Sequence, residues 1–182
     1  MVLFLAIGSP ALADGYCDDL WYTRNDVFDQ AGFCFGSTLG KAVFDNGDCT
    51  TQTISLGPNA KKFVDYVTNL EAQAGCAVDT NRSAINLADL AIRRRLTDQP
   101  IMDELGSGCL GWVGPVVPLY AGQKTSSATI GQIDPGDFVS FGYLSVGDWS
   151  YVTTWSHNWG SLRSGGWLLN NIGDGACQDW AG

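Results

Sequence analysis

The sequence predicts an α+β protein: a small helical domain stapled by disulfides, followed by a domain of short β-strands. Apolar residues recur at helical spacing over residues 17–98, whereas apolar and small residues alternate between glycine-rich turns over residues 112–169. Six cysteines, an even number, are typical of a disulfide framework in an oxidising compartment. The segment 98–111 carries Pro100 and three glycines, a composition that indicates a boundary between the two halves.

The N-terminal run "MVLFLAIGSPALA", residues 1–13, predicts a secretory signal peptide with Asp14 as the first mature residue. It is apolar and ends in the Ala-x-Ala cleavage pattern, although no Lys or Arg precedes it. It is too short for a membrane-spanning helix, which needs roughly 20 apolar residues, and no other stretch is long and apolar enough. We therefore expect a secreted or periplasmic protein.

These patterns divide the chain into a signal peptide (1–13), a helical domain (14–80), a helix with a linker (81–108) and a strand domain (109–182). The net charge of −9 excludes nucleic acid as a partner, because nucleic-acid binding needs a basic face. The single His and the absence of C-x-x-C argue against a zinc site, and no calcium loop or phosphate loop is found. We expect no cofactor.

Three helices are predicted in the first half. The first carries one apolar stripe and ends at Gly32, a plausible C-cap; the second covers 58–74, and the third covers 86–96. The Arg93–Arg95 run is interpreted as a solvated helix end that complements the helix dipole. Its alternative is an anion site. The stripe residues are Leu20, Trp21, Val27, Phe28, Ala31, then Phe63, Val64, Val67, Leu70, then Leu87, Leu90, Ala91, Leu96.

Position along the chain suggests how the cysteines pair. The shortest loop would enclose a glycine-rich, hairpin-like turn and contribute about 3 kcal/mol in the chain-entropy model. A second bridge would clamp the first two helices together, and a third would tie the ends of the strand half. Other pairings stay open, since even four cysteines allow three of them. The expected pairs are Cys34–Cys49, Cys17–Cys76 and Cys109–Cys177.

The second half predicts strands at 129–133, 138–144, 149–154 and 165–168. A Pro-Gly turn at 134–137 separates the first two, and a Gly-Asp turn at 147–148 precedes the third.

The first half resembles the YARHG domain, an extracellular bacterial module without an established activity. The Ala-Arg-His triplet of the family is replaced by Asp29-Gln30-Ala31, so no role of that His is carried over. In this family context Arg24 and Asn25 are interpreted as structural, with Arg24 bonding nearby loop carbonyls. The matching positions are Leu20, Arg24, Asn25, Val27, Phe28, Gly32, Phe33 and Phe35, with Phe44 and Leu70-Glu71 further on.

The second half resembles the bacterial SH3-like (SH3b) domain, which implies an SH3-like β-barrel with Trp149 and Trp167 as structural residues of its core. The usual opening of that family is replaced by "LYAGQKTSS", residues 119–127, so its peptide groove is not carried over. The whole layout is also similar to an uncharacterised family of exported alphaproteobacterial proteins. The matching positions are Ile130, Gly131, Ile133, Gly136, Val139, Gly147, Asp148, Trp149, Val152, Gly166, Trp167 and Leu168.

Catalytic interpretations find little support, and we expect no enzyme. A Cys/His peptidase would need a free thiol beside His157, but all six cysteines are expected in bridges. A glycosidase would need paired carboxylates. The available ones are expected on solvated helix faces or in the linker: Asp18, Asp19, Asp26, Asp29, Asp103 and Glu104.

The insertion "WSHNWGSLRS", residues 155–164, is the candidate ligand site, because two tryptophans on one loop can stack on a sugar or a peptide. The alternative is that they seal one mouth of the barrel. The sequence thus predicts a non-enzymatic binding module for peptidoglycan or a cell-envelope protein; the alternative is a structural or protein-interaction module without a small ligand. The candidate site residues are Trp155, His157, Asn158, Trp159 and Arg163.

Overall fold

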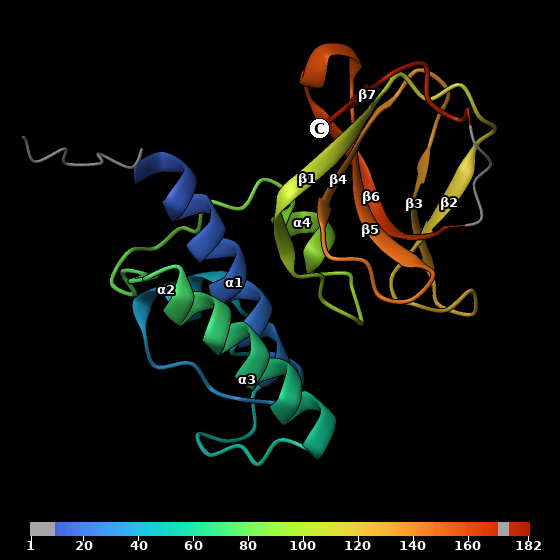
Figure 1. Cartoon of the computed structure of the whole chain (residues 1–182). Coiled ribbons are helices and arrows are strands. Elements are labelled where there is room, and N and C mark those ends of the chain that lie inside the picture. Colours follow the sequence, from blue (N-terminus) through green and yellow to red (C-terminus); the bar gives the residue numbers. More distant parts are fainter. Residues whose placement is uncertain (1–9, 171–174) are drawn as a thin grey trace, which may run out of the picture. The chain divides into compact units, whose positions relative to one another are not determined.

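The computed structural model describes residues 10–170 and 175–182 and divides the chain into two compact units, Met1–Leu87 and Ala88–Gly182 (Figure 1). This division falls inside the segment 81–108 that the sequence assigns to a helix and linker. Most of the predicted signal peptide, residues 1–9, lies outside the described residues. Among the helices described, none has the length and apolar character to cross a membrane.

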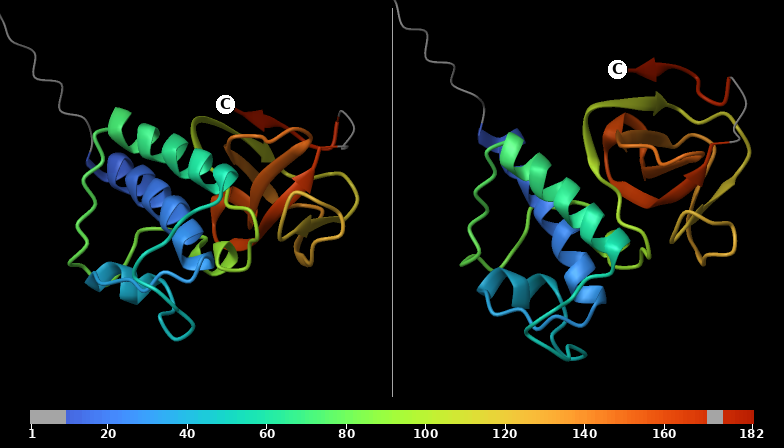
Figure 2. Two further views of the ribbon diagram at one scale, coloured as in Figure 1. Left: turned by 90° about the horizontal axis from the view of Figure 1, so that it is seen from below. Right: turned by 60° about the horizontal axis from the view of Figure 1, so that its bottom comes forward.

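The N-terminal unit is built on two long antiparallel helices, α1 (Pro10–Gln30) and α3 (Pro58–Gln73), which lie side by side in both views of Figure 2. The first helix ends as predicted, because Gly32 adopts a φ of 83° and the amide of Phe33 donates to the carbonyl of Phe28. The disulfide Cys17–Cys76 joins the start of α1 to the chain just after α3. It clamps the two helices together in the expected way.

The short helix α2 (Thr38–Val43) replaces the hairpin-like turn expected between Cys34 and Cys49, which do form a disulfide. The hydroxyl of Ser37 accepts the amide of Gly40 and caps this helix. Gly40 is needed for packing, since a Cβ there would lie 2.8 Å from Phe35. The glycines that suggested a turn thus allow a close helix contact.

Two charged residues of α1 have partners that the sequence did not reveal. Asp18 was expected on a solvated face, but its carboxylate is buried and accepts from the guanidinium of Arg82 and the amide of Asn86. Asp18 therefore fixes the segment after α3 against α1. Arg24 was expected to bond loop carbonyls, but its Nε donates to the carboxylate of Glu71 on α3, at 2.9 Å.

The C-terminal unit is one antiparallel sheet of seven strands in the order β3-β2-β6-β5-β4-β1-β7. In the part of the chain that the structure describes, β3 and β7 are the two ends, so the sheet is not closed and the expected SH3-like barrel is not confirmed. The predicted strands 129–133, 138–144 and 149–154 are confirmed to within one residue at their ends. The strands are β1 (Met102–Leu110), β2 (Val117–Tyr120), β3 (Thr129–Ile133), β4 (Phe138–Tyr143), β5 (Trp149–Trp155), β6 (Leu162–Leu169) and β7 (Trp180–Ala181).

The predicted linker 98–111 contains strand β1 instead, and its glycines have a packing reason. A Cβ at Gly106 would lie 2.8 Å from the backbone of Gly142 on β4, and one at Gly108 would lie 2.9 Å from the ring of Trp159. Glycine in a strand often marks such a close approach. The composition that indicated a boundary therefore reflects tight packing at this position.

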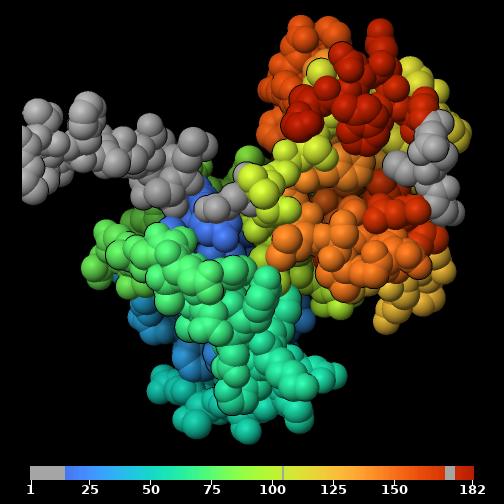
Figure 3. Space-filling view, in the orientation of Figure 1, coloured from blue at the N-terminus to red at the C-terminus, as the bar shows by residue number. Residues whose placement is uncertain are grey.

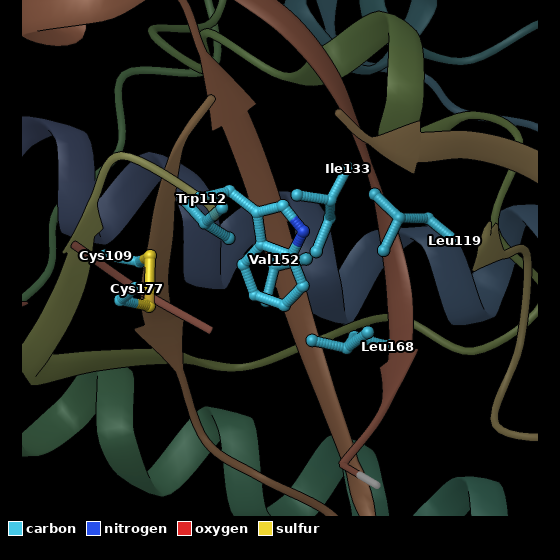
Figure 4. Close-up of a cluster of buried hydrophobic side chains, with 8 residues drawn as sticks. Cys109, Trp112, Leu119, Ile133, Val152, Leu168 and Cys177 are labelled. Atoms are coloured by element: carbon cyan, nitrogen blue, oxygen red, sulfur yellow. A yellow bond between two sulfur atoms is a disulfide. The ribbon is translucent and has the colours of Figure 1, made fainter. Parts of the chain in front are cut away.

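One core of this unit lies between the strands and the third disulfide. Figure 4 shows the indole of Trp112 between the Cys109–Cys177 bridge on one side and Ile133 and Leu168 on the other. The Trp112 Nε1 donates to the carbonyl of Pro115 at 2.8 Å, so its polar group is satisfied.

A second core involves α4 (Leu90–Arg93), which is far shorter than the helix expected at 86–96. Ile92 and Leu96 pack with Tyr151 and Trp167, whose side chains alternate with those of the first core along β5 and β6. The Trp167 indole is fully buried and donates to the carbonyl of Asp98.

Candidate functional site

The predicted binding loop contains a single 3-10 turn, η1 (His157–Trp159), between β5 and β6. Ser156 closes the loop, because its hydroxyl oxygen accepts the amide of Ser161 at 2.7 Å. Asn158 and Trp159 have φ values of 57° and 56°, a conformation that costs non-glycine residues of order 1 kcal/mol or more each. Two consecutive strained residues at a surface aromatic are unusual, and such strain is frequent at binding sites.

The strained loop places two rings around Phe138. The ring of Trp159 meets Phe138 edge-on at a centroid distance of 5.3 Å, and the ring of His157 does so at 5.1 Å. Trp159 also covers Gly108 and is 40% exposed. His157, Phe138 and Trp159 are called the aromatic platform below: two exposed rings that rest on the buried ring of Phe138.

Two of the other predicted site residues direct their polar groups into the fold. The Trp155 Nε1 donates to the hydroxyl of Thr153, and Arg163 Nη1 donates to the buried carboxylate of Asp137 at 2.6 Å. That carboxylate also accepts an amide of the turn at 134–137. Asn158 is exposed. Trp149 packs edge-on against Tyr120, in keeping with a structural role.

Sequence reasoning missed a groove at the β1 end of the sheet, with a volume of about 640 Å³. The residues nearest the C-terminus, red in Figure 3, lie at the surface of this unit. Phe141 and Ala176 line the groove and also pack against the core around Trp112. The lining residues are Asp103, Leu105, Ser107, Phe141, Tyr143, Ser145, Ser150, Asn170, Gly175, Ala176 and Trp180.

The groove combines aromatic and polar groups. Trp180 is 54% exposed and its ring lies 5.8 Å from that of Phe141. Ser150 accepts from Asn170 Nδ2 at 3.0 Å and shares a hydrogen bond of 2.8 Å with Ser145. These residues come from separate segments without a common motif. The one sequence signal was an isolated tryptophan close to the C-terminus.

A buried polar network lies on the α4 side of the same sheet. The Arg93 side chain, expected at a solvated helix end, is fully buried and donates to Gln99 Oε1 at 2.7 Å. Its guanidinium carbon lies 5.6 Å and 5.8 Å from the ring centroids of Tyr143 and Tyr151. Tyr151 in turn donates to the carboxylate of Asp89 at 2.8 Å. Asp89, Arg93, Gln99 and Tyr151 are buried, whereas Tyr143 also lines the groove. The mutual bonds of the buried groups indicate a structural role.

This network predicts a loss of stability at alkaline pH. Burial, and then the nearby Asp89 carboxylate, raise the pKa of Tyr151 well above its ordinary value. The folded state therefore keeps the phenol proton after the unfolded chain has lost it. The contribution of this phenol to the free energy of unfolding is fully present below about pH 10. It decreases as the pH rises further, by up to about 1.4 kcal/mol per pH unit.

Urea unfolding at pH 9 to 11.5 tests this expectation. We expect Tyr151→Phe to flatten the pH dependence, whereas Tyr66→Phe, which alters an exposed tyrosine, leaves it unchanged. Equal slopes in wild type and Tyr151→Phe would show that this phenol does not control alkaline unfolding.

The residues considered for catalysis from the sequence are placed as follows. All six cysteines are in disulfides, in the pairing expected from the sequence. Within 10–170 and 175–182, no group of three or more His, Cys, Asp or Glu side chains is placed to hold a metal ion. Among the helix carboxylates, Asp18, Asp19 and Asp26 are buried, which corrects the expectation of solvated faces.

Comparison with known proteins accounts for nearly the whole sequence. Residues 75–182 match the family described as Domain of unknown function (DUF4453), which is more than half of the chain. The chain belongs to this family. The DUF4453 region contains the entire sheet, the aromatic platform and the groove. Since this region matches DUF4453, the resemblance to the SH3-like domain is not supported.

The first half gives a second match. Residues 6–72 match the YARHG domain, which confirms that resemblance. Together with the three disulfides, it indicates that this DUF4453 protein folds in an oxidising compartment. No curated protein and no solved structure matches the chain.

Proposed function

We propose that this protein is a secreted or periplasmic binding protein without catalytic activity, and that its DUF4453 unit attaches to peptidoglycan. The observation that carries the proposal is the aromatic platform: two consecutive residues of positive φ hold a 40% exposed tryptophan on the surface. Strain of this kind persists only when the surrounding structure imposes it.

The chemistry of the platform suits a glycan or a peptide stem. The indole of Trp159 offers a flat apolar face to the C–H groups of a sugar ring, and the exposed His157 offers a ring N–H at its side. Packing on Phe138 and Gly108 fixes the indole in advance, so little side-chain entropy is lost on binding.

A second function, a structural or protein-interaction module without a small ligand, is favoured by two of the predicted site residues. Trp155 and Arg163 use their polar groups within the fold, the latter on a buried carboxylate. Such internal bonds are what a loop that only packs would show. The two functions differ in whether removing the exposed indole of Trp159 weakens binding to peptidoglycan.

Co-sedimentation with purified peptidoglycan sacculi separates them. We expect Trp159→Ala to weaken retention about tenfold, which corresponds to about 1.4 kcal/mol, and Trp159→Phe to restore part of it. The matched control is Val113→Ala, which shortens another exposed apolar residue and should bind like wild type. Retention of an envelope protein but not of sacculi would favour the second function, and equal retention of wild type and Trp159→Ala would contradict the proposal.

A further inference from the structure

We infer that the groove between β1, β4 and β7 is a second ligand site, built for a neutral saccharide. None of its lining residues belongs to the η1 loop, so it stands independently of the platform. Its volume of about 640 Å³ lies within the range of small-molecule sites. The inference rests on three features: an aromatic wall, a wall of oriented hydrogen-bonding groups, and the charges around them.

The aromatic wall is the pair Trp180 and Phe141. The two rings lie 5.8 Å apart with an angle of 40° between their planes, and Trp180 keeps about half of its surface open. Its backbone is fixed, because Trp180 pairs with Cys109, which forms the third disulfide. The exposed indole is thus anchored beside the disulfide-linked strand β1 and can stack on one sugar ring.

The polar wall consists of Ser145, Ser150 and Asn170. Because Asn170 donates to Ser150 through Nδ2, its Oδ1 remains oriented as an acceptor. The hydrogen bond between Ser145 and Ser150 fixes the hydroxyl of Ser145 in the same row. Ser150 itself is buried, so these side chains are already ordered before a ligand binds. Alternating donors and acceptors of this kind match the vicinal hydroxyls of a sugar.

The charges determine the ligand class. Among the lining side chains that the structure describes, the only charged group is Asp103, and no Lys or Arg faces the groove. A phosphate or a carboxylate would meet a negative group without a compensating cation, which disfavours anions. A carboxylate beside hydroxyl and amide groups instead accepts hydrogen bonds from sugar hydroxyls. The alternative occupant, a cationic peptide, is an outcome of the test below.

Two-dimensional 1H–15N spectra of the full oxidised chain test the inference, because the seven tryptophans give seven indole N–H resonances. The Trp180 and Trp159 resonances are identified by their disappearance in Trp180→Phe and Trp159→Phe. The probes are maltotriose, cellotriose and tri-N-acetylchitotriose, each added to about ten times a dissociation constant of order 1 mM. Trilysine serves as the cationic probe.

We expect at least one trisaccharide to shift the Trp180 resonance saturably while the Trp159 resonance stays in place. Asn170→Ala should weaken that binding at least about fivefold, since it removes one oriented polar group. Val116→Ala, an exposed position outside the groove, should not weaken it. An unchanged Trp180 resonance with all three sugars, or a response to trilysine alone, would overturn the inference. Neither result depends on whether sacculi are bound at Trp159.

Discussion

Replacing Arg93 with methionine is expected to lower the free energy of unfolding of the C-terminal unit by about 3–5 kcal/mol, the usual cost of breaking a buried charged network. Arg93 is fully buried and donates to Gln99, while its guanidinium faces two tyrosine rings. Methionine fills much of the volume but leaves the Gln99 oxygen without this donor. It also removes the positive charge near the buried Asp89 carboxylate.

Urea unfolding followed by tryptophan fluorescence measures this loss, because every tryptophan except Trp21 lies in the C-terminal unit. Arg95→Met is the matched control, since Arg95 is exposed two positions further along; its change should stay within about 0.5 kcal/mol. A loss below about 1 kcal/mol for Arg93→Met would show that the buried network is not a main source of stability.

Removing the disulfide of the C-terminal unit is the second large effect that we expect. The double variant Cys109→Ala/Cys177→Ala should lose about 4 kcal/mol, because the bridge spans 68 residues. The same change at Cys34 and Cys49, which are 15 residues apart, should cost about 3 kcal/mol in the N-terminal unit.

Tryptophan fluorescence and the far-UV helix signal distinguish the loss of one disulfide from the loss of the other. Loss of the Cys109–Cys177 bridge should shift the tryptophan transition, since Trp112 packs in the same core cluster as this disulfide. Loss of the Cys34–Cys49 bridge should leave that transition in place and shift the far-UV helix signal. If the C-terminal variant kept its wild-type transition, the disulfide would not be the constraint that we describe.

Features that depend on neighbours in the chain were predictable. The helix at 58–74 carries its own apolar stripe and a proline in its first turn. The strand at 129–133 ends at the Pro-Gly turn, and the strand at 149–154 begins after the Gly-Asp turn. The cysteine pairs followed from what each pair brackets. In each case the local pattern and the final packing favour the same structure.

Features that depend on contacts distant in sequence were not predictable. Arg93 lies in a run that resembles a solvated helix end, and only the tyrosines contributed by β4 and β5 make its burial favourable. Gly106 and Gly108 suggested a linker, although β4 and Trp159 require them in a strand. The groove is assembled from β1, β4, β5 and β7, together with residues that precede β5 and follow β6, so no single segment carries its signature.

At the predicted binding loop, the structure brings together only some of the candidate residues, and whether the loop binds a ligand stays a prediction. Trp159 and His157 meet on Phe138, which comes from β4 and was not a candidate. Arg163 instead supports the turn at 134–137 through Asp137. A composition of aromatic and polar residues marks a loop of interest, but it does not show which side chains share a surface.

The ratio of wild type to Trp159→Ala that co-sediments with the same preparation of sacculi tests the proposed function most directly. A ratio of about ten, with Val113→Ala behaving as wild type, is the result that we predict. A ratio of one, or no sedimentation of either protein, would contradict a role of this protein in binding peptidoglycan through the aromatic platform.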